Sequence, residues 1–281
     1  MEISSSGLSF RISLVDIEML RPHEEVVDSI VKSLAGEMAA EGAIRDPLIV
    51  DEKNFVILDG MHRFSSLKLL RCRFVPCCLV DYDSPKIRVG SWFRLFLVRE
   101  ADSLAPKLLL ENGLKYSTRK LEPGQLHYSP HAIVLTANGS EFILSGSLDQ
   151  LQAARAAVRL EKALVNMGYH VEYLSETAAI EHIRSGQANF VISLPIFTKE
   201  QIREFGTKGL LAPHKVTRHV IPSRPLHVNV PLEVLADVNL SQNEANRKIG
   251  ELLSKGHVDR KPPGSVVDGR RYEEELLVFS D

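Results

Sequence analysis

The sequence has little cysteine, little tryptophan and no long apolar run. Its 281 residues include three cysteines and one tryptophan. Without a run of about 18 apolar residues, no transmembrane helix is expected. The N-terminus also lacks the basic start and apolar core of a signal peptide. The cysteines, Cys72, Cys77 and Cys78, are odd in number and clustered. This pattern fits a reducing cytoplasm better than a disulfide framework, and we expect the cysteines to pack in the core, with metal or redox work as the alternative.

An excess of positive charge is also missing. The 34 Lys and Arg residues are balanced by 36 Asp and Glu residues, which leaves a net charge of −2 with histidine neutral. A protein whose main task is binding nucleic acid usually carries a basic field. The composition therefore disfavours that class. With 44% hydrophobic residues, the chain can bury a sizeable core, and its length suggests one large domain or two small ones.

Periodic patterns predict a chain that mixes helices and strands, in the α+β class. Helices are expected at 24–41, 62–70, 101–112, 148–167, 176–185, 199–206 and 241–256. Strands are expected at 8–15, 47–60 (two short ones), 74–82, 85–96, 170–175 and 189–195. Hairpins are expected to turn at Asn138-Gly139 and at Asp268-Gly269. Pro, Gly and Ser collect near 121–131, so we place domains at 1–125, 126–225 and 226–281, the last a small helix-hairpin appendage.

The stretch "LDGMHRF" combines features of a phosphate site. Gly60 permits close backbone approach or positive φ. The N-terminus of the helix that follows offers free N–H groups and a positive dipole end. His62 and Arg63 add donors, and Asp59 could hold Mg²⁺ beside the phosphate. The alternative is an ordinary Asp-Gly turn with a surface arginine, and spacing alone leaves both open.

Two further clusters carry charge. "RPHEEVVDSI" places Glu24 and Glu25 in the first turn of the first predicted helix, where carboxylates are favoured in any protein. The functional alternative is a general base facing the phosphate site. "APHKVTRHVIP" gathers donors between prolines and predicts an anion site, with a solvated basic turn as the alternative. Its donors are His214, Lys215, Thr217, Arg218 and His219.

These motifs, taken in order, resemble a known family. "DGMHRF" after a strand resembles the Asp-Gly-His-Arg signature of the ParB/sulfiredoxin superfamily. Together with "RPHEE", "SWF" and "HKVTRHVIP", it resembles the archaeal free serine kinases of that superfamily. The four motifs run from about Leu8 to Pro225. The resemblance implies a ParB/sulfiredoxin-like nucleotide domain followed by a second α/β domain that carries the late loop.

The same resemblance implies an activity and its residues. The family phosphorylates L-serine to O-phospho-L-serine with ADP or ATP, in cysteine or serine metabolism. Glu24 matches its catalytic base and Asp59 its essential aspartate and metal ligand. The implied nucleotide phosphate site is Asp59, Gly60, Met61, His62 and Arg63. The implied serine pocket is Trp92, Lys215, Thr217, Arg218 and His219. Met61 stands where the kinases often have histidine, and the tail after Pro225 is longer than expected.

Alternatives remain beside this hypothesis. A ParB-like regulator that binds DNA would use the basic residues of the tail and its helix-plus-hairpin. A sulfiredoxin-like reductase would need a reactive cysteine beside the turn, whereas Cys72 ends the helix. A binding module without catalysis is the third. We expect L-serine, an adenine nucleotide and Mg²⁺ as ligands and neither nucleic acid nor a membrane as partner. A homodimer is left open.

Overall fold

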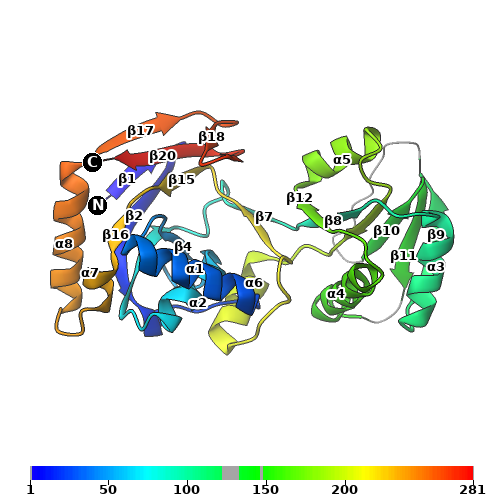
Figure 1. The fold of residues 1–281 in the computed structure, drawn as a ribbon, viewed down its shortest axis with the longest axis horizontal. Coiled ribbons are helices and arrows are strands. Elements are labelled where there is room, and N and C mark those ends of the chain that lie inside the picture. Colours follow the sequence, from blue (N-terminus) through cyan, green and yellow to red (C-terminus); the bar gives the residue numbers. More distant parts are fainter. Residues whose placement is uncertain (1, 122–132, 146–147, 281) are drawn as a thin grey trace. The chain divides into compact units, whose positions relative to one another are not determined.

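The computed structural model describes residues 2–121, 133–145 and 148–280, without the side chain of Ser145, as a mixed α+β chain (Figure 1). The chain forms two compact units. Unit 1 comprises Met1–Arg88, Lys199–His214 and His219–Asp281, and unit 2 comprises Val89–Thr198 and Lys215–Arg218. The division differs from the predicted one. The predicted boundary at 125/126 lies outside the described residues, and the predicted extension 226–281 falls within unit 1.

A five-stranded sheet forms the core of unit 1, in the order β1-β2-β6-β4-β5. Its strands are β1 (Glu2–Ser5), β2 (Leu8–Asp16), β4 (Leu48–Asp51), β5 (Ile57–Asp59) and β6 (Phe74–Val80). Every residue of β6 is buried, including Cys77 and Cys78. Burial raises the pKa of Cys78 to about 12 and that of Cys72 to about 11. The predicted packing of the cysteines in the core is thus confirmed, and it removes the reactive thiolate that a reductase would need.

The first helix begins later than the sequence suggests. Unit 1 contains α1 (Asp28–Glu41), α2 (Met61–Leu69), α6 (Lys199–Lys208), α7 (Leu232–Ala236) and a short 3-10 helix, Ile17–Met19. The helix predicted from residue 24 starts at Asp28, so Glu24 and Glu25 precede it in extended backbone. α1 packs against α2. A short ladder of β3 (Ala43–Ile44) and β16 (Val230–Pro231) follows α1.

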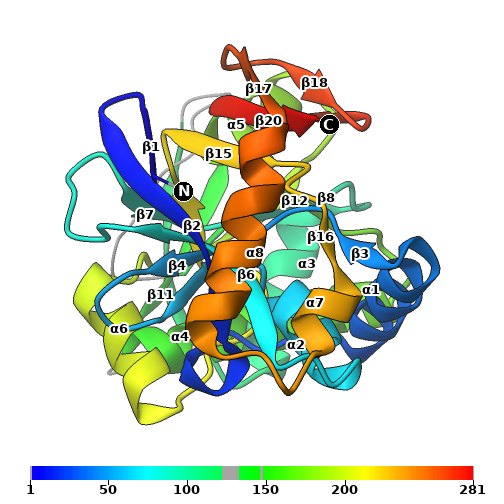
Figure 2. The ribbon, with the colours of Figure 1, turned by 90° about the vertical axis from the view of Figure 1, so that its left-hand side faces the viewer.

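The C-terminal segment packs into unit 1. α8 (Gln242–Lys255) begins with the predicted capping box of Ser241 and Glu244 and lies against β2 (Figure 2). The side chain of Asn246 accepts hydrogen bonds from Ser13 Oγ at 2.7 Å and from Leu14 N at 2.8 Å. Another sheet has the order β15 (Ser223–Leu226), β20 (Glu275–Ser280) and β17 (His257–Lys261). The predicted turn at Asp268-Gly269 joins β18 (Val266–Val267) and β19 (Arg270–Arg271).

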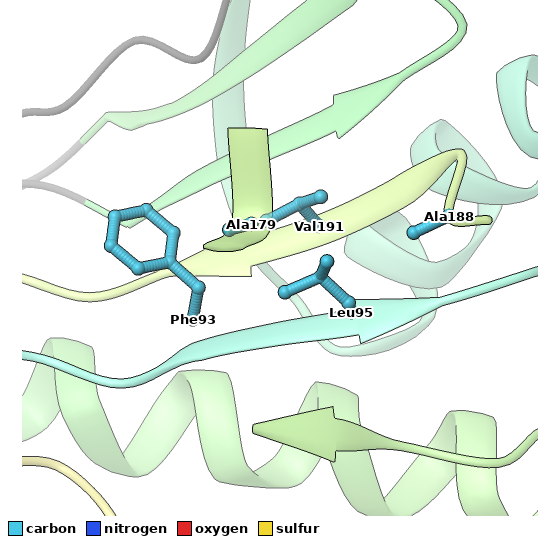
Figure 3. Packing of buried hydrophobic residues seen from close by; sticks show 5 residues of the cluster. All are labelled: Phe93, Leu95, Ala179, Ala188 and Val191. Carbon is cyan, nitrogen blue, oxygen red and sulfur yellow. The ribbon is translucent and has the colours of Figure 1, made fainter. Parts of the chain in front are cut away.

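Unit 2 is built on a six-stranded sheet in the order β12-β8-β13-β10-β11-β9. The strands are β8 (Phe93–Phe96), β9 (Lys115–Lys120), β10 (Val134–Ala137), β11 (Ser140–Ser145), β12 (Glu172–Leu174) and β13 (Phe190–Ser193). The helices are α3 (Ala101–Glu111), α4 (Gln150–Asn166) and α5 (Glu176–Arg184). Phe93 and Leu95 of β8 pack with Val191 of β13, Ala179 of α5 and Ala188 (Figure 3). The hairpin turning at Asn138-Gly139 is confirmed.

The chain passes between the units four times, and the first and last of these crossings lie in short strands. The segment predicted as one strand, 85–96, is divided into β7 (Arg88–Gly90) and β8, with Ser91 and Trp92 between them. β14 (Arg218–Val220) carries the chain back into unit 1. Among the described residues, no helix has both the length and the apolar character needed to cross a membrane.

Candidate active site at the end of β5

The turn between β5 and α2 has a backbone that only glycine fits well. Gly60 has φ of 104° and stands at the N-cap position of α2. A Cβ atom added to Gly60 would lie 2.8 Å from Leu48 Cγ and 3.1 Å from Arg63 Nη2. Among the described residues, no side chain caps this end of α2. The positive end of the α2 dipole therefore lies at this turn, where it favours an anion.

Replacing Gly60 by alanine is expected to destabilise the protein by roughly 2 kcal/mol or more, because strain and a steric clash add. Gly42→Ala is the matched control, since Gly42 also has positive φ but no atom within 4 Å of the added Cβ. Urea unfolding of both variants measures the difference. Equal losses of stability would show that the close contacts at Gly60 are relieved at no cost.

Asp59 lies between two guanidinium groups. Its Oδ2 accepts from Arg63 Nη2 at 2.8 Å and from Arg224 Nη1 at 2.6 Å. Arg224 in turn donates through Nε to Glu274 Oε1 at 2.7 Å. Burial raises the pKa of the Asp59 carboxyl, but the charges of Arg224 and Arg63 outweigh burial and hold this pKa well below its usual range. Asp59 is therefore ionised at neutral pH.

The donors of Arg63 are directed to protein atoms. Its Nη1 donates to the carbonyl oxygens of Asp46 at 3.0 Å and Pro47 at 2.9 Å, in addition to the Asp59 contact. Arg63 thus fixes the Asp59–Gly60 turn to the chain segment that enters β4. This geometry favours a positioning role, and the phosphate contact predicted for Arg63 stays a prediction.

His62 and Met61 occupy the first turn of α2. Nε2 of His62 accepts a hydrogen bond from Val27 N, at the start of α1, at 3.1 Å. Since Nε2 accepts, any proton on the ring is on Nδ1. The ring also meets that of His214 edge-on, with centroids 5.2 Å apart. Met61 is buried, at 7% exposure, and its side chain packs in the core.

The donor set does not fit the magnesium ion predicted at Asp59. The carboxylate is already neutralised by two guanidinium groups, and a divalent cation there would be repelled by both. Within the ranges that the structure describes, no three His, Cys, Asp or Glu side chains are grouped to hold a metal ion. We therefore assign no metal to Asp59.

Glu24 belongs to an extended segment beside β5. Arg21 forms a parallel bridge with Val56, and Glu24 forms a parallel bridge with Ala212. Ala212 N donates to the His23 carbonyl at 2.9 Å, and Glu25 N donates to the Ala212 carbonyl at 2.8 Å. Since the Arg21 segment runs parallel to β5, continuing both chains brings Glu24 to the same end of the sheet as Asp59. The side chain of Glu24 is partly exposed there.

A group of neutral rings supports this segment. His23 is 1% exposed, and its Nδ1 lies 2.7 Å from the Ile57 carbonyl oxygen. His219 Nε2 lies 2.8 Å from the Tyr82 hydroxyl, and the His23 and His219 rings meet edge-on at 5.6 Å. Burial lowers the pKa of His23 to about 4, and burial together with His23 lowers the pKa of His219 to about 3. His219 is therefore neutral at pH 7, and its predicted contact with the substrate stays a prediction.

Because the pKa values of His23 and His219 are lowered, we expect the protein to lose stability in mild acid. Both have lower pKa values in the folded chain than the usual 6.5. The unfolded chain thus gains protons first as the pH falls below about 6.5. We expect His23 alone to remove about 2 kcal/mol of unfolding free energy between pH 7 and pH 5. Urea unfolding at both pH values measures this. His23→Asn should reduce the loss, and an unchanged loss in that variant would contradict the assignment.

Three of the residues predicted to bind substrate meet in unit 2. Lys215 Nζ lies 4.4 Å from the centroid of the Trp92 ring, and Arg218 Cζ lies 5.5 Å from it. Lys215 has φ of 61°, in the left-handed region. Thr217 is buried, at 7% exposure. The arrangement presents two cations on one indole ring, which can order them for a carboxylate or phosphate group.

The late loop is thus divided between the two units. His214 and His219 belong to unit 1, and Lys215 to Arg218 belong to unit 2. Unit 1 holds Glu24 and the residues from Asp59 to Arg63. Sequence patterns pointed to all of these but not to Arg224, Glu274 or Tyr82. Only Arg224 had a local signal, because it stands two residues after "HKVTRHVIP".

Comparisons with known proteins agree with this geometry. No protein-family model matches the chain. An ATP-dependent L-serine kinase of Desulfurococcus mucosus is 27% identical over 232 residues, which cover 79% of this chain and 90% of the kinase. The ADP-dependent L-serine kinase SerK of Thermococcus kodakarensis is 25% identical over 230 residues, covering 79% of this chain and 91% of SerK.

A solved structure shows the same fold. A free serine kinase in complex with AMP superposes with a TM-score of 0.67 at 22% identity, covering 80% of this chain and 93% of the kinase. The resemblance predicted from the four ordered motifs is therefore confirmed: over most of its length this chain is similar in sequence and in fold to the free L-serine kinases.

Proposed function

We propose that this chain is a free L-serine kinase, which transfers a phosphoryl group from ADP or ATP to the hydroxyl of L-serine and forms O-phospho-L-serine. The observation that carries the proposal is in unit 1. A partly exposed carboxylate, Glu24, lies at the same end of the sheet as the Asp59–Gly60 turn and the open N-terminus of α2. A base beside an anion site is what phosphoryl transfer to an alcohol requires.

The residues of unit 1 support distinct roles in such a transfer. The N–H groups at the start of α2 would hold a nucleotide phosphate over Gly60, with the proton on Nδ1 of His62 as an additional donor. Glu24 would accept the proton of the serine hydroxyl as the new bond to phosphorus forms. Asp59 would keep the guanidinium groups of Arg63 and Arg224 oriented at the turn. Phosphoryl transfer needs mainly positioning and charge stabilisation, and these groups supply both.

The residues of unit 2 support recognition of the amino acid. Lys215 and Arg218 lie on Trp92, and a guanidinium can bind the carboxylate of serine bidentately. The indole ring would also help to exclude water, which competes with serine for the phosphoryl group.

The basic tail does not favour the DNA-binding alternative. Arg247 pairs with Glu251, Arg260 with Glu275 and Lys261 with Asp259. These three basic residues therefore each have a carboxylate partner in the same segment, which reduces the charge they offer to nucleic acid. The tail residues also belong to unit 1 and pack on its sheet.

The direct test is a product assay. Purified protein is incubated with L-serine and ADP, or with L-serine and ATP, in Mg²⁺ and in EDTA, and phosphoserine is followed by phosphorus NMR. Phosphoserine with AMP from the ADP reaction would assign ADP as a donor, and phosphoserine with ADP from the ATP reaction would assign ATP. The EDTA reactions measure any need for a divalent cation. Absence of phosphoserine under all four conditions would refute the kinase proposal.

A further inference from the structure

Arg224 is a guanidinium held in place from two sides at the Asp59–Gly60 turn. Its side chain is 12% exposed, and those of Asp59 and Glu274 are 41% and 17% exposed. Nη1 donates to Asp59 and Nε donates to Glu274. The third nitrogen, Nη2, has no hydrogen-bond partner among the described residues and is not fully enclosed by protein. A guanidinium with one amino group left over can bind an oxyanion.

The local charge favours an anion. The charges of Arg224, Arg63 and Arg270 all lower the pKa of Asp59. Three cations thus act on the single carboxylate of Asp59, and one of them, Arg224, is also paired with Glu274. The α2 N-terminus directly follows Asp59 and Gly60 and adds its positive dipole end.

A purely structural role gives a poor account of this arrangement. Partly buried ion pairs contribute little net stability, because desolvation of the charges offsets their attraction. Glu274 comes from the segment before β20, 50 residues after Arg224. The fold therefore brings a distant carboxylate to fix the direction of one arginine, which is how binding sites hold side chains in a defined orientation.

We propose that Arg224 is a further residue that binds a nucleotide phosphate at the Asp59–Gly60 turn, and that Glu274 positions it. This inference rests on the proposed function and extends it to a residue outside the four motifs. It also gives the C-terminal segment a part in the site, through Glu274.

The test compares four variants: Arg224→Gln, Arg224→Lys, Glu274→Gln and Glu275→Gln. Glu275 is the matched control, because it is the adjacent carboxylate and bonds instead to Ser5, Ser6 and Arg260. Arg224→Gln should raise the KM for the nucleotide roughly 10- to 100-fold and leave the KM for serine within about twofold. Arg224→Lys keeps the positive charge but loses the planar pair of guanidinium donors. Its KM for the nucleotide should lie between those of the unmodified protein and Arg224→Gln. Glu274→Gln should raise the nucleotide KM roughly 3- to 10-fold, and Glu275→Gln should not change it.

Calorimetric titration with ADP and with adenosine separates phosphate binding from adenine binding. Arg224→Gln should weaken ADP binding and leave adenosine binding unchanged. Unchanged ADP affinity in a folded Arg224→Gln protein would overturn the inference. So would equal losses for Glu274→Gln and Glu275→Gln, which would mark a structural effect. If Arg224→Gln does not fold, Arg224→Lys and Glu274→Gln decide the question.

The titration also separates this inference from the proposed function. If the unmodified protein forms no phosphoserine but binds ADP through Arg224, the kinase proposal fails and the phosphate site stands. If it forms phosphoserine and all variants bind ADP equally, the kinase proposal stands and the role of Arg224 is refuted.

Discussion

Replacing Glu24 by glutamine is expected to slow phosphoserine formation roughly 100- to 10,000-fold, the usual contribution of a general base. The variant keeps the size of the side chain and the backbone bridge to Ala212 but cannot accept the serine proton. Because the phosphates are expected to bind at α2, nucleotide affinity should stay within about twofold. Steady-state rates and nucleotide titration measure the two quantities separately.

Glu25→Gln is the matched control for this experiment. Glu25 is the next carboxylate in the chain and is exposed, and its backbone N–H is already bonded to Ala212. We expect its turnover to equal that of the unmodified protein. A normal rate in Glu24→Gln, or an equal loss in both variants, would contradict the assignment of the base to Glu24.

Replacing Asp59 by asparagine should lower both turnover and stability. The change removes the negative charge that orients Arg63 and Arg224 through one oxygen atom. We expect a loss of about 1–3 kcal/mol in unfolding free energy, because two charged donors lose their ionic partner. Turnover should fall roughly tenfold or more, because misplaced binding groups slow the reaction even when no catalytic group has been removed.

Asp83→Asn separates these two effects. Asp83 also accepts from two cations, Arg203 Nη1 at 2.5 Å and Lys53 Nζ at 2.6 Å, with a similar exposure of 46%. Its loss should reduce stability to a comparable or smaller extent and leave turnover unchanged. If Asp59→Asn and Asp83→Asn reduce turnover equally, Asp59 affects turnover through the stability of the protein and not through the geometry of the active site.

Local sequence patterns were sufficient to predict those helices, strands and turns whose sequence signals span only a few residues. The alternation of β2, the Asn138-Gly139 hairpin and the capping box of α8 were all predicted and are present. The start of α1 was predicted four residues early, because charged and apolar spacing continues upstream of Asp28. Tertiary hydrogen bonds to Phe55 and Ala212 hold that upstream segment extended, and no local rule contains those partners.

The pairing of the tail could not be predicted either. α8 was predicted as part of a separate appendage, yet Asn246 bonds to β2. Likewise, β15 and β20 pair in parallel across about 50 residues of intervening chain. Contacts between distant segments depend on the whole arrangement of the chain, which periodicity does not encode.

The sequence by itself determined the chemistry available to this protein. The Asp-Gly turn before a helix, the glutamate after Pro22-His23 and the "HKVTRH" loop follow from residue order, because glycine, carboxylates and guanidinium groups have fixed local properties. Only the tertiary structure decided how that chemistry is used. It placed Glu24 beside β5, made His219 neutral by burial, and set Arg224 and Glu274 against Asp59. Those outcomes depend on neighbours far away in the chain, and neighbours set the pKa, the orientation and the charge of a site.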